Sequence, residues 1–598
     1  MEKNFEIRTK ISEPHDFNKN LIETLKNEKS GKLQNIKDCW ENWPVTYIIY
    51  NKGKNGANKQ AYVGETVNTI RRMHEHLKNE QKESLDFFVG IISKEFNQSV
   101  IKDLEAHLIP LMHADGYKML NGNAGQNVNN YFNALEYRKS FRKVWEQLKR
   151  KKIVKGDYDE LINSEMFKFS PYKTLDPKQY EVENKVIKQA LTSLKNKEER
   201  SIVVEGGPGT GKSVLVIHLL KRLVDLQNGV VNEDDEIEDE LKEQVNLMKK
   251  IIEEKGCLKI GIVTPIKQFR LTLENVVKKT PGLKKDNVIS PYRLVYKDSE
   301  YKEKGVYKAI GENKYDILIV DETHRLCDED KALNLYKNLF EKGLSEYDWI
   351  KECSRVQIFF YDREQQVSSK DDEKVKKEFE KIKKEKEYYH ELKSQFRCLG
   401  GEDYIKHIEK ILKGKEQKVI DFDGKYEFYL FEDVDKMRNE IIKKDNPKQN
   451  IRGRMIAGYA WEDKVLDKFD WNDRDIIKKE VWIDYENAVN EIGCIHTVQG
   501  QDINYAGVII GNDLRYSKEK GIYIDYSNYK DKTEKDNFDE NNDKDMKKLT
   551  EQIIKTYKVL LTRGINGTYV YACDKGLRDY LKTVMKTYNE KKQKTNNN

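Results

Sequence analysis

Residues 206–213 have the types and spacing of a phosphate-binding loop. They read Gly-Gly-Pro-Gly-Thr-Gly-Lys-Ser, which fits the pattern G-x-x-x-x-G-K-S/T. In such a loop the backbone N–H groups surround a phosphate chain, the lysine reaches the β- and γ-phosphates, and the hydroxyl binds Mg²⁺. We therefore predict a nucleoside triphosphate site formed by Gly206, Gly207, Pro208, Gly209, Thr210, Gly211, Lys212 and Ser213.

Two adjacent carboxylates, Asp321 and Glu322, follow an apolar run later in the chain. A carboxylate at the end of a strand beside a phosphate loop holds Mg²⁺ through water, and its neighbour orients the attacking water. We predict that Ser213 and Asp321 bind this metal and that Glu322 is catalytic. The two segments together indicate hydrolysis of ATP or a close relative.

The segments around the loop predict the elements that position it. An apolar run precedes the loop and an amphipathic run follows it, which gives the strand–loop–helix context that the motif requires. From about residue 170 apolar segments alternate with helical patterns, which favours parallel sheets covered on both faces. The predicted strands are 201–205, 259–264, 316–321, 356–361, 454–460, 505–511 and 567–573.

The order of motifs over about residues 170–580 resembles that of superfamily 1 helicases, and more closely the Schlafen group 3-like DNA/RNA helicase domain. The resemblance implies an α/β fold with two RecA-like parallel-sheet domains that close around ATP and act on a nucleic-acid strand. The matching segments are Leu175–Gln179 (glutamine motif), Val263–Phe269 (motif Ia), Asp321–Arg325 (II), Asp362–Gln365 (III), Ser394–Arg397 (IV), His496–Gln501 (V) and Leu560–Arg563 (VI).

The same resemblance implies roles for individual residues. Gln179 would read adenine, which favours ATP over GTP, and Gln365 would sense the γ-phosphate. Arg397 and Arg563 would approach the γ-phosphate from the second domain, with Arg563 as the arginine finger. Motif V, which contains Gly500, would couple the bound strand to the nucleotide site. An ATPase that changes shape without moving along a strand fits these motifs equally.

Residues 45–125 resemble the GIY-YIG endonuclease family. Val45-Thr-Tyr47 occupies the first motif with its glycine replaced, and Tyr62-Val-Gly64 occupies the second. Arg72 and His76 are four residues apart and share one face of a predicted helix. Glu105 and Asn121 follow in the family's order. The resemblance implies a small α/β domain that cuts phosphodiester bonds.

Hydrolysis of a phosphodiester needs a base, a positive charge and a cation, and the resemblance distributes these roles. Glu105 would bind one Mg²⁺ or Mn²⁺ with water completing the shell. Arg72 would stabilise the added charge on the phosphate, and Tyr47 would be the general base. Tyr62 and His76 would contact the water or the leaving group. Asn121 would fix the region around Glu105.

Composition limits the number of domains, the partners and the compartment that we expect. A chain of 598 residues predicts about four domains. No run of about 18 apolar residues is present, so we expect no membrane partner. The N-terminus lacks an apolar signal region, and the 7 scattered cysteines indicate reduced thiols in a cytoplasm. A net charge of +6 permits basic grooves but does not itself indicate nucleic acid.

These patterns predict a series of domains and two inserts. A basic run, Lys149–Lys152, indicates either a helix that touches phosphates or a solvated face. We expect both inserts to be mobile surface loops or excursions from the domain. The predicted parts are an N-terminal extension (1–35), the nuclease domain (36–130), a basic helical linker (131–169), RecA-like domain 1 (170–385, insert 229–256), RecA-like domain 2 (386–580, insert 526–548) and a disordered tail (581–598).

The sequence favours an ATP-driven motor joined to a metal-dependent endonuclease that cuts DNA in restriction, phage defence or repair. An RNA- or tRNA-directed helicase–nuclease is an alternative. A third hypothesis is an ATP-switched sensor that binds nucleic acid without cutting it. The oligomeric state stays open.

Overall fold

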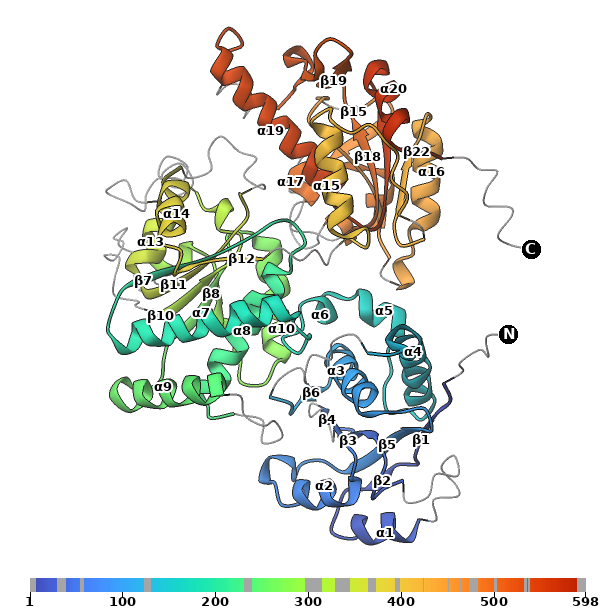
Figure 1. Cartoon of the computed structure of the whole chain (residues 1–598), viewed down its shortest axis with the longest axis vertical. Helices are drawn as coiled ribbons and strands as arrows, with labels where there is room; N and C mark the ends of the chain where they lie inside the picture. The colour runs from blue at the N-terminus through green and yellow to red at the C-terminus, as the bar shows by residue number, and fades with distance from the viewer. Residues whose placement is uncertain are drawn as a thin grey trace, which may run out of the picture.

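The structure contains three successive α/β units, each built around one main sheet (Figure 1). In Figure 1 the N-terminal unit (blue) lies at the bottom, the first parallel-sheet domain (teal to green) at the left and the second (orange to red) at the top. None of the described helices is long and apolar enough to cross a membrane. This computed structural model describes residues 7–28, 39–53, 59–122, 131–230, 239–295, 315–327, 345–363, 373–392, 398–422, 424–449, 451–462, 464–472, 482–484, 486–498, 503–531, 535 and 538–588.

The N-terminal unit has a six-stranded sheet in the order β1-β5-β3-β4-β6, with β2 also paired to β5. The central strand β3 is buried on both faces, because alternate residues pack into two separate cores. Ile48 packs with helix α3, whereas Tyr47 and Ile49 pack with helix α2. The elements are β1 (Thr9–Ile11), β2 (His15–Asp16), α1 (Leu21–Asn27), β3 (Val45–Tyr50), β4 (Gln60–Thr66), α2 (Thr69–His76), β5 (Phe87–Ser93), α3 (Gln98–Ala114) and β6 (Lys118–Met119).

Both predicted boundaries of this unit are wrong. The predicted extension contributes β1 and β2 to the sheet, because their backbones pair with β5. The predicted linker contributes α4 (Ala134–Arg150), whose apolar face enters the same core. Burial of Phe141 and Trp145 contributes about 1.5–3 kcal/mol for each side chain, which a loosely attached linker would forgo.

The basic run at the end of α4 makes ion pairs within the protein. Lys149 Nζ lies 2.6 Å from Asp157 Oδ1, and Lys151 Nζ lies 2.6 Å from Glu13 Oε1. These two lysines therefore face carboxylates of their own unit in this structure, and the solvated-face interpretation describes them better than the phosphate-contact one.

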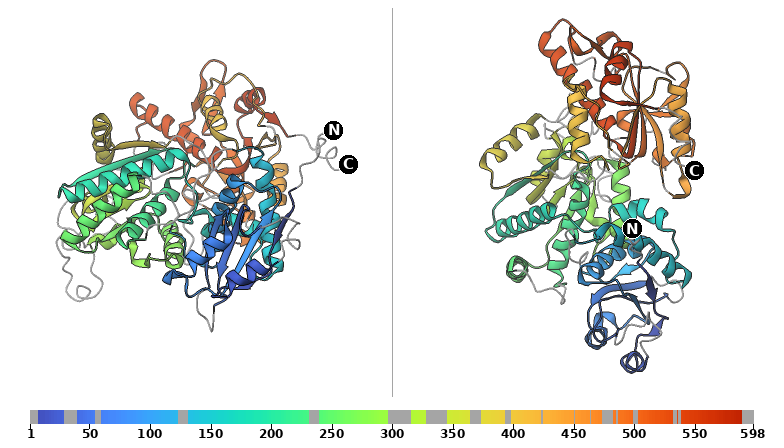
Figure 2. Two further views of the ribbon diagram at one scale, coloured as in Figure 1. Left: turned by 60° about the horizontal axis from the view of Figure 1, so that its bottom comes forward. Right: turned by 45° about the vertical axis from the view of Figure 1, so that its right-hand side comes forward.

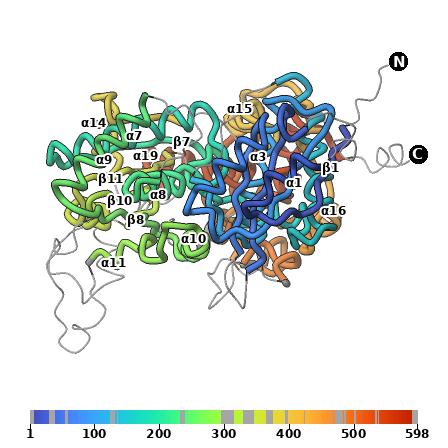
Figure 3. The backbone as a smooth tube through the Cα atoms, turned by 90° about the horizontal axis from the view of Figure 1, so that it is seen from below, coloured from blue at the N-terminus to red at the C-terminus, as the bar shows by residue number. Residues whose placement is uncertain are grey.

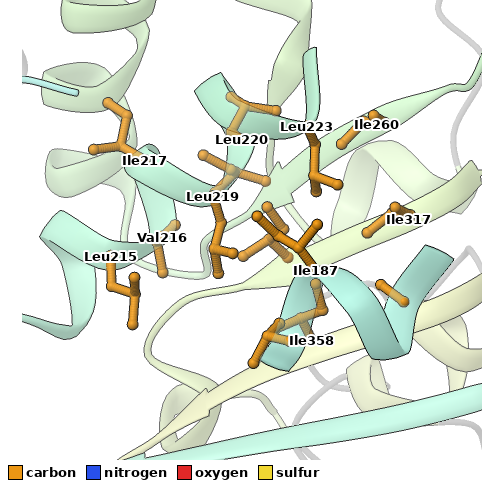
Figure 4. Close-up of a cluster of buried hydrophobic side chains, with 14 of the residues drawn as sticks. Ile187, Leu215, Val216, Ile217, Leu219, Leu220, Leu223, Ile260, Ile317 and Ile358 are labelled. Carbon is orange, nitrogen blue, oxygen red and sulfur yellow. The ribbon is translucent and has the colours of Figure 1, made fainter. Parts of the chain in front are cut away.

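The first parallel-sheet domain has strand order β12-β7-β11-β10-β8-β9, with every pair parallel. Helix α8 packs Leu219 and Leu223 on this sheet beside Ile317 of β10 (Figure 4). The elements are α7 (Pro177–Lys195), β7 (Arg200–Gly206), α8 (Lys212–Gln227), α9 (Asp239–Lys255), β8 (Ile260–Val263), α10 (Lys267–Lys279), β9 (Val288–Ile289), α11 (Tyr292–Val295), β10 (Tyr315–Val320), α13 (Glu346–Glu352), β11 (Ser354–Tyr361), α14 (Glu373–Glu385) and β12 (Tyr389–Leu392).

Two expectations for this domain are corrected. The boundary after residue 385 is wrong, because β12 pairs in parallel with β7 and belongs to the first sheet. The insert 229–256 is not a loop over its described C-terminal part, because α9 packs Met248 and Ile251 into the domain core.

The second parallel-sheet domain has an eight-stranded sheet in the order β15-β16-β17-β14-β18-β21-β13-β22. Together the two domains have strands at all seven predicted positions. The elements are α15 (Gly401–Leu412), β13 (Glu427–Leu430), α16 (Val434–Lys444), β14 (Gly453–Ala457), β15 (Lys464–Val465), β16 (Phe469–Asn472), β17 (Ile492–Gly493), α17 (Ile495–Val498), β18 (Ile503–Ile510), the hairpin β19 (Leu514–Ser517) and β20 (Gly521–Ile524), α19 (Asp543–Leu561), β21 (Gly564–Ala572), α20 (Lys575–Val584) and β22 (Lys586–Thr587).

The predicted C-terminal limits also shift. The predicted tail begins too early, because α20 runs to Val584 and β22 pairs with β13 at the sheet edge. The predicted insert 526–548 includes the first turns of α19, whose Leu549 is fully buried.

The N-terminal unit lies beside the first parallel-sheet domain (Figures 2 and 3), and the C-terminal end of α3 contacts that domain. Ala114 packs against the cores of both units. His113 lies 3.2 Å through Nδ1 from Ser170 Oγ and 3.5 Å through Nε2 from Thr280 Oγ1 at the end of α10. Burial, together with the charges of Lys279 and Lys221, lowers the pKa of His113 to about 4, although a hydrogen bond with the Lys279 backbone opposes the shift. His113 is therefore a neutral hydrogen-bonding residue in this junction.

A short helix segment extends from this junction toward the second parallel-sheet domain. Helices α5 (Tyr158–Asn163) and α6 (Glu165–Lys168) link the units, and Glu165 accepts a hydrogen bond of 2.9 Å from Thr272 of α10. Asn163 Nδ2 donates to the Gln449 carbonyl at 3.1 Å, and Asn504 Nδ2 lies 3.5 Å from Asn163 Oδ1. The N-terminal unit thus contacts both parallel-sheet domains.

Candidate functional site

The phosphate loop joins β7 to α8, as the sequence predicts. Gly209 and Gly211 have φ angles of 77° and 79°, which side-chain-bearing residues rarely adopt. A Cβ at Gly206 would lie 2.5 Å from Thr210 Oγ1, so the close turn excludes a larger residue there. The loop leaves the N-terminal N–H groups of α8 directed at an anion site.

Lys212 contacts two backbone carbonyls and one carboxylate of the protein. Its Nζ donates to the carbonyls of Gly206 at 2.7 Å and Gly207 at 2.9 Å, and it lies 2.9 Å from Asp362 Oδ2. Both side chains of the ion pair are buried. Triphosphate oxygens would replace Asp362 as the negative partner of this ammonium.

Asp362 is a site residue that sequence reasoning did not assign. It follows β11, which pairs with β7, so its carboxylate emerges at the same sheet edge as the phosphate loop. That edge, at the carboxyl ends of parallel strands, is where such sheets bind ligands. The rule could have identified Asp362 once β11 was predicted as a neighbour of β7.

Asp321 and Glu322 lie at the end of β10 beside the loop. Burial and the adjacent charge of Glu322 raise the pKa of Asp321, while the Ser213 hydroxyl opposes this shift. Burial alone would raise the pKa of Glu322, but His324 and Lys212 outweigh it and lower that pKa. Ser213 and Asp321 are thus brought together as predicted, in a place suited to one Mg²⁺ with water ligands.

Glu322 is held in an unusual conformation. Its φ angle is 52°, in the left-handed region that non-glycine residues visit rarely. His324 Nε2 lies 2.9 Å from Glu322 Oε2 and orients the carboxylate. The predicted catalytic carboxylate is therefore positioned by a residue of its own motif.

Gln179 makes two hydrogen bonds within the protein. Its Oε1 accepts from the Asp176 N–H at 3.1 Å, and its Nε2 donates to the Thr210 carbonyl at 3.0 Å. The amide joins the start of α7 to the phosphate loop. One lone pair and one N–H of the amide are not used in these two bonds, and the adenine contact stays a prediction.

Of the residues predicted to reach the nucleotide site from the second parallel-sheet domain, the structure describes Arg563. Arg563 lies between α19 and β21 and is 1% exposed. Its approach to the γ-phosphate stays a prediction. Gln365, Arg397 and Gly500 lie outside the described residues.

A second cluster forms in the N-terminal unit, where the predicted residues of two strands and one helix meet. Tyr47 Oη lies 2.7 Å from His76 Nε2 and accepts from Arg72 Nε at 3.4 Å. The Tyr62 ring packs on the edge of the His76 ring, with centroids 5.0 Å apart. The spacing of Arg72 and His76 on α2 therefore places both nitrogen atoms at one phenol oxygen.

Gly64 makes room for this arrangement. It lies directly opposite Tyr47 in the β3–β4 pair. A Cβ at Gly64 would lie 2.3 Å from Tyr47 Oη. Only glycine leaves space for the phenol, which gives the second motif's glycine a physical reason.

Asn121 fixes the backbone of β4, and its predicted effect on the region around Glu105 stays a prediction. Its Oδ1 accepts from the Val63 N–H at 3.1 Å, and its Nδ2 donates to the Val63 carbonyl at 2.8 Å. The amide extends the sheet edge beyond β6 and holds the residue between Tyr62 and Gly64. Its effect on the cluster passes through these two neighbours.

Glu105 lies on α3, half-buried, and its charge faces the two tyrosines. The described residues contain no group of three or more His, Cys, Asp or Glu side chains that could hold a metal. A cation at Glu105 would therefore be completed largely by water, which suits Mg²⁺. The donor set fits the predicted metal on chemistry.

The electrostatics of the cluster follow from burial. Burial raises the pKa of Tyr47 well above its usual range, and Arg72 opposes this shift. Burial lowers the pKa of His76 to about 2, with added repulsion from Lys82 and Arg72. His76 is therefore neutral at physiological pH.

Lys82 is a second residue that sequence reasoning missed. It lies in a short 3-10 helix (Glu80–Lys82), and its Nζ lies 2.6 Å from His76 Nδ1. It also lies 3.7 Å from the centre of the Tyr62 ring. No motif in the sequence indicates this contact, because it joins two separate helices.

Comparisons with known proteins found a family that matches the two parallel-sheet domains. Residues 199–574 match the family described as Schlafen group 3, DNA/RNA helicase domain. An uncharacterized protein of Saccharomyces cerevisiae is 24% identical over 454 residues, which covers 68% of this chain and 90% of that protein. The family match begins one residue before β7, so the N-terminal unit lies outside it.

Two solved structures are similar over part of the chain. Domain III of the Thermotoga maritima replication initiation protein DnaA has 15% identity and a TM-score of 0.19, and covers 46% of this chain and 86% of its own. The Pif1 helicase from Bacteroides, in complex with ADP-AlF3 and ssDNA, has 12% identity and a TM-score of 0.20, and covers 54% of this chain and 85% of its own. At these TM-scores neither structure describes the arrangement of the units.

Proposed function

Because the chain belongs to the family of the Schlafen group 3 DNA/RNA helicase domain, we propose that it is an ATP-driven nucleic-acid motor joined to a metal-dependent endonuclease of the GIY-YIG type. The proposed substrate is DNA, and the proposed setting is restriction, phage defence or repair. The helicase-like ATPase is the part that the family supports. The nuclease, its metal and the choice of DNA go beyond the family.

The motor proposal is supported by the meeting of four predicted residues at one sheet edge. Lys212 and Ser213 start α8, and Asp321 and Glu322 follow β10. This arrangement supplies an ammonium for the phosphates, a hydroxyl and a carboxylate for Mg²⁺, and a second carboxylate for water. Hydrolysis would proceed by attack of that water on the γ-phosphorus with release of ADP.

The nuclease proposal rests chiefly on one observation, which is that Arg72 and His76 both approach the hydroxyl of Tyr47. Two nitrogen atoms at one phenol oxygen favour its deprotonated form and so suit a general base. Burial acts in the opposite direction by raising the Tyr47 pKa. A cation held by Glu105 would supply the positive charge that stabilises the cleaved phosphate.

In the proposed cut, Tyr47 in its phenolate form takes a proton from a water molecule while that water attacks phosphorus. The bond from phosphorus to the leaving sugar oxygen breaks, and that oxygen takes a proton from solvent. Arg72 stabilises the charge that accumulates on the phosphate oxygens. Arg72 is suited to this because its side chain is 17% exposed and therefore reaches solvent from a mostly buried stem.

The experiment is nicking of supercoiled plasmid by the full chain with Mg²⁺, with and without ATP, alongside an ATPase assay. We expect Arg72→Ala and Glu105→Gln to lose nicking by about 100-fold or more while retaining ATPase activity. Arg71→Ala is the matched control, because Arg71 is the adjacent arginine and its side chain is 78% exposed. Equal nicking by Arg72→Ala, Arg71→Ala and wild type refutes the nuclease.

The motor is tested in the same assay by Lys212→Ala, with Lys249→Ala on the exposed face of α9 as its control. We expect Lys212→Ala alone to abolish ATP hydrolysis, since the ammonium contacts the transferred phosphate. Stimulation of the ATPase by single-stranded RNA rather than DNA would move the proposed substrate to RNA. ATP binding with no cleavage of any nucleic acid would leave a sensor.

A further inference from the structure

Lys82 is a lysine buried inside the cluster that surrounds Tyr47. It is 8% exposed, and its ammonium contacts a ring nitrogen of His76 and the face of the Tyr62 ring. Neither of these two groups carries a negative charge. Burial of an ammonium costs free energy, and hydrogen bonds and ring contacts offset part of that cost.

The contact fixes where the proton of His76 resides. An ammonium has three N–H donors and no acceptor, so Lys82 can only donate to His76 Nδ1. His76 is neutral, because burial lowers its pKa to about 2. A neutral imidazole carries one proton, which must then reside on Nε2. That Nε2–H points at Tyr47 Oη, 2.7 Å away.

We infer that Lys82 is a positioning residue, which holds His76 in its Nε2–H form so that His76 and Arg72 both donate to the hydroxyl of Tyr47. The geometry carries this inference, since Lys82, His76 and Tyr47 form one continuous chain of contacts of 2.6 Å and 2.7 Å. The catalytic meaning of this role rests on the proposed nuclease function.

The direction of the hydrogen bond between His76 and Tyr47 decides what Tyr47 can do. With Nε2 protonated, His76 cannot accept a proton from Tyr47. The hydroxyl proton of Tyr47 must point away from both donors, and Tyr47 oxygen is stabilised when it becomes negative. In the opposite tautomer Nε2 would accept from Tyr47, and His76 would become the base. Lys82 therefore selects Tyr47 over His76 as the group that exchanges a proton with water.

Three lysine variants separate the parts of this role. Lys82→Met keeps the length of the side chain but removes every donor. Lys82→Gln keeps an amide N–H for Nδ1 without the charge. Lys78→Met is the matched control, because Lys78 is an exposed lysine just after α2.

The first readout is the His76 tautomer, measured by NMR of the full chain labelled with ¹⁵N-histidine. The His76→Gln variant identifies the His76 signals among the 10 histidines. We expect the Nε2–H form in the wild type, in Lys78→Met and in Lys82→Gln. In Lys82→Met we expect a mixture of tautomers and a His76 pKa closer to its ordinary value. An Nδ1–H form in the wild type, or an unchanged tautomer in Lys82→Met, overturns the inference.

The second readout is plasmid nicking, which separates this inference from the proposed function. We expect Lys82→Met to lower kcat by about 10- to 100-fold with KM unchanged, and Lys82→Gln to recover most of that loss. If Lys82→Gln is as inactive as Lys82→Met while its tautomer is preserved, the positioning role is refuted. If the wild type cuts nothing, the nuclease proposal fails, and the NMR result still decides whether Lys82 sets the tautomer.

Discussion

Replacement of Gly64 by alanine tests whether the close packing around Tyr47 matters for chemistry. A Cβ at Gly64 would lie 2.3 Å from Oη and 2.4 Å from Cζ of Tyr47. Non-bonded carbon atoms approach to about 3.5 Å, so the phenol ring would have to move by about 1 Å. Tyr47 is 0% exposed, so its ring is enclosed by neighbouring side chains.

The size of the effect follows from this displacement. Overpacking of a buried site costs about 1–3 kcal/mol, so we expect the N-terminal unit to unfold at a lower temperature. A shift of about 1 Å would also lengthen the 2.7 Å contact between Tyr47 and His76. Misplacement of a catalytic group by about 1 Å lowers the rate by about 100-fold.

The assay compares plasmid nicking and ATP hydrolysis by the same Gly64→Ala preparation. We expect kcat for nicking to fall by about 100-fold, while ATPase activity is unchanged because the phosphate loop lies in another unit. The ATPase rate thus reports that the rest of the chain is folded. Wild-type nicking together with a wild-type unfolding curve would refute the reasoning, because the clash would then be relieved without cost.

Three other substitutions test contacts described above. Asp362→Ala leaves the buried ammonium of Lys212 unpaired, so thermal unfolding should show a loss of about 3–5 kcal/mol, partly recovered by added ATP; an unchanged curve contradicts the ion pair. His113 has a pKa lowered from 6.5 to about 4, so it contributes stability that is complete above pH 6.5 and is lost as the pH falls toward 4, because the unfolded chain alone binds that proton. His113→Gln should therefore flatten the acid side of the stability profile, and identical profiles would exclude this assignment. Asn121→Ala removes both hydrogen bonds to Val63 and should cost about 1–3 kcal/mol in chemical unfolding, whereas no change would mean that the sheet edge holds without the amide.

The phosphate loop and its flanking strands could be predicted because their signals are local. The glycine spacing and the apolar run before it are contained in a few residues, and strands buried on both faces have nearly continuous apolar sequences. Strand β12 could not be assigned to its sheet in the same way. Its sequence, Tyr389-His-Glu-Leu392, is half polar because it lies at a sheet edge, and its partner is known only from its pairing with β7.

The residues of the candidate sites also fall into two groups, those that local sequence indicates and those that only the fold brings to the site. The types and order of three residues in the sequence indicated a site, and the structure brings them together: Tyr47, Arg72 and His76. Lys82 was not predicted, because its short helix carries no motif residue, and Asp362 received no role although it begins motif III. The adenine contact of Gln179 stays a prediction, because in this structure its amide belongs to a capping box at the start of α7.

Helix α3 has a consequence for how far apart the two chemistries can operate. It runs from Gln98 to Ala114, which makes it about 25 Å long. Glu105 lies near its middle, and His113 lies at the end that is buried against the first parallel-sheet domain. The second parallel-sheet domain meets the N-terminal unit through polar contacts of Asn163, which can break and re-form at little cost. Closure of the two parallel-sheet domains would therefore move the second domain past Asn163 and leave α3 in place. Helix α3 would then keep the N-terminal site at a fixed distance from the first parallel-sheet domain. A nucleic-acid strand bound by the motor would meet that site at a constant distance along the strand.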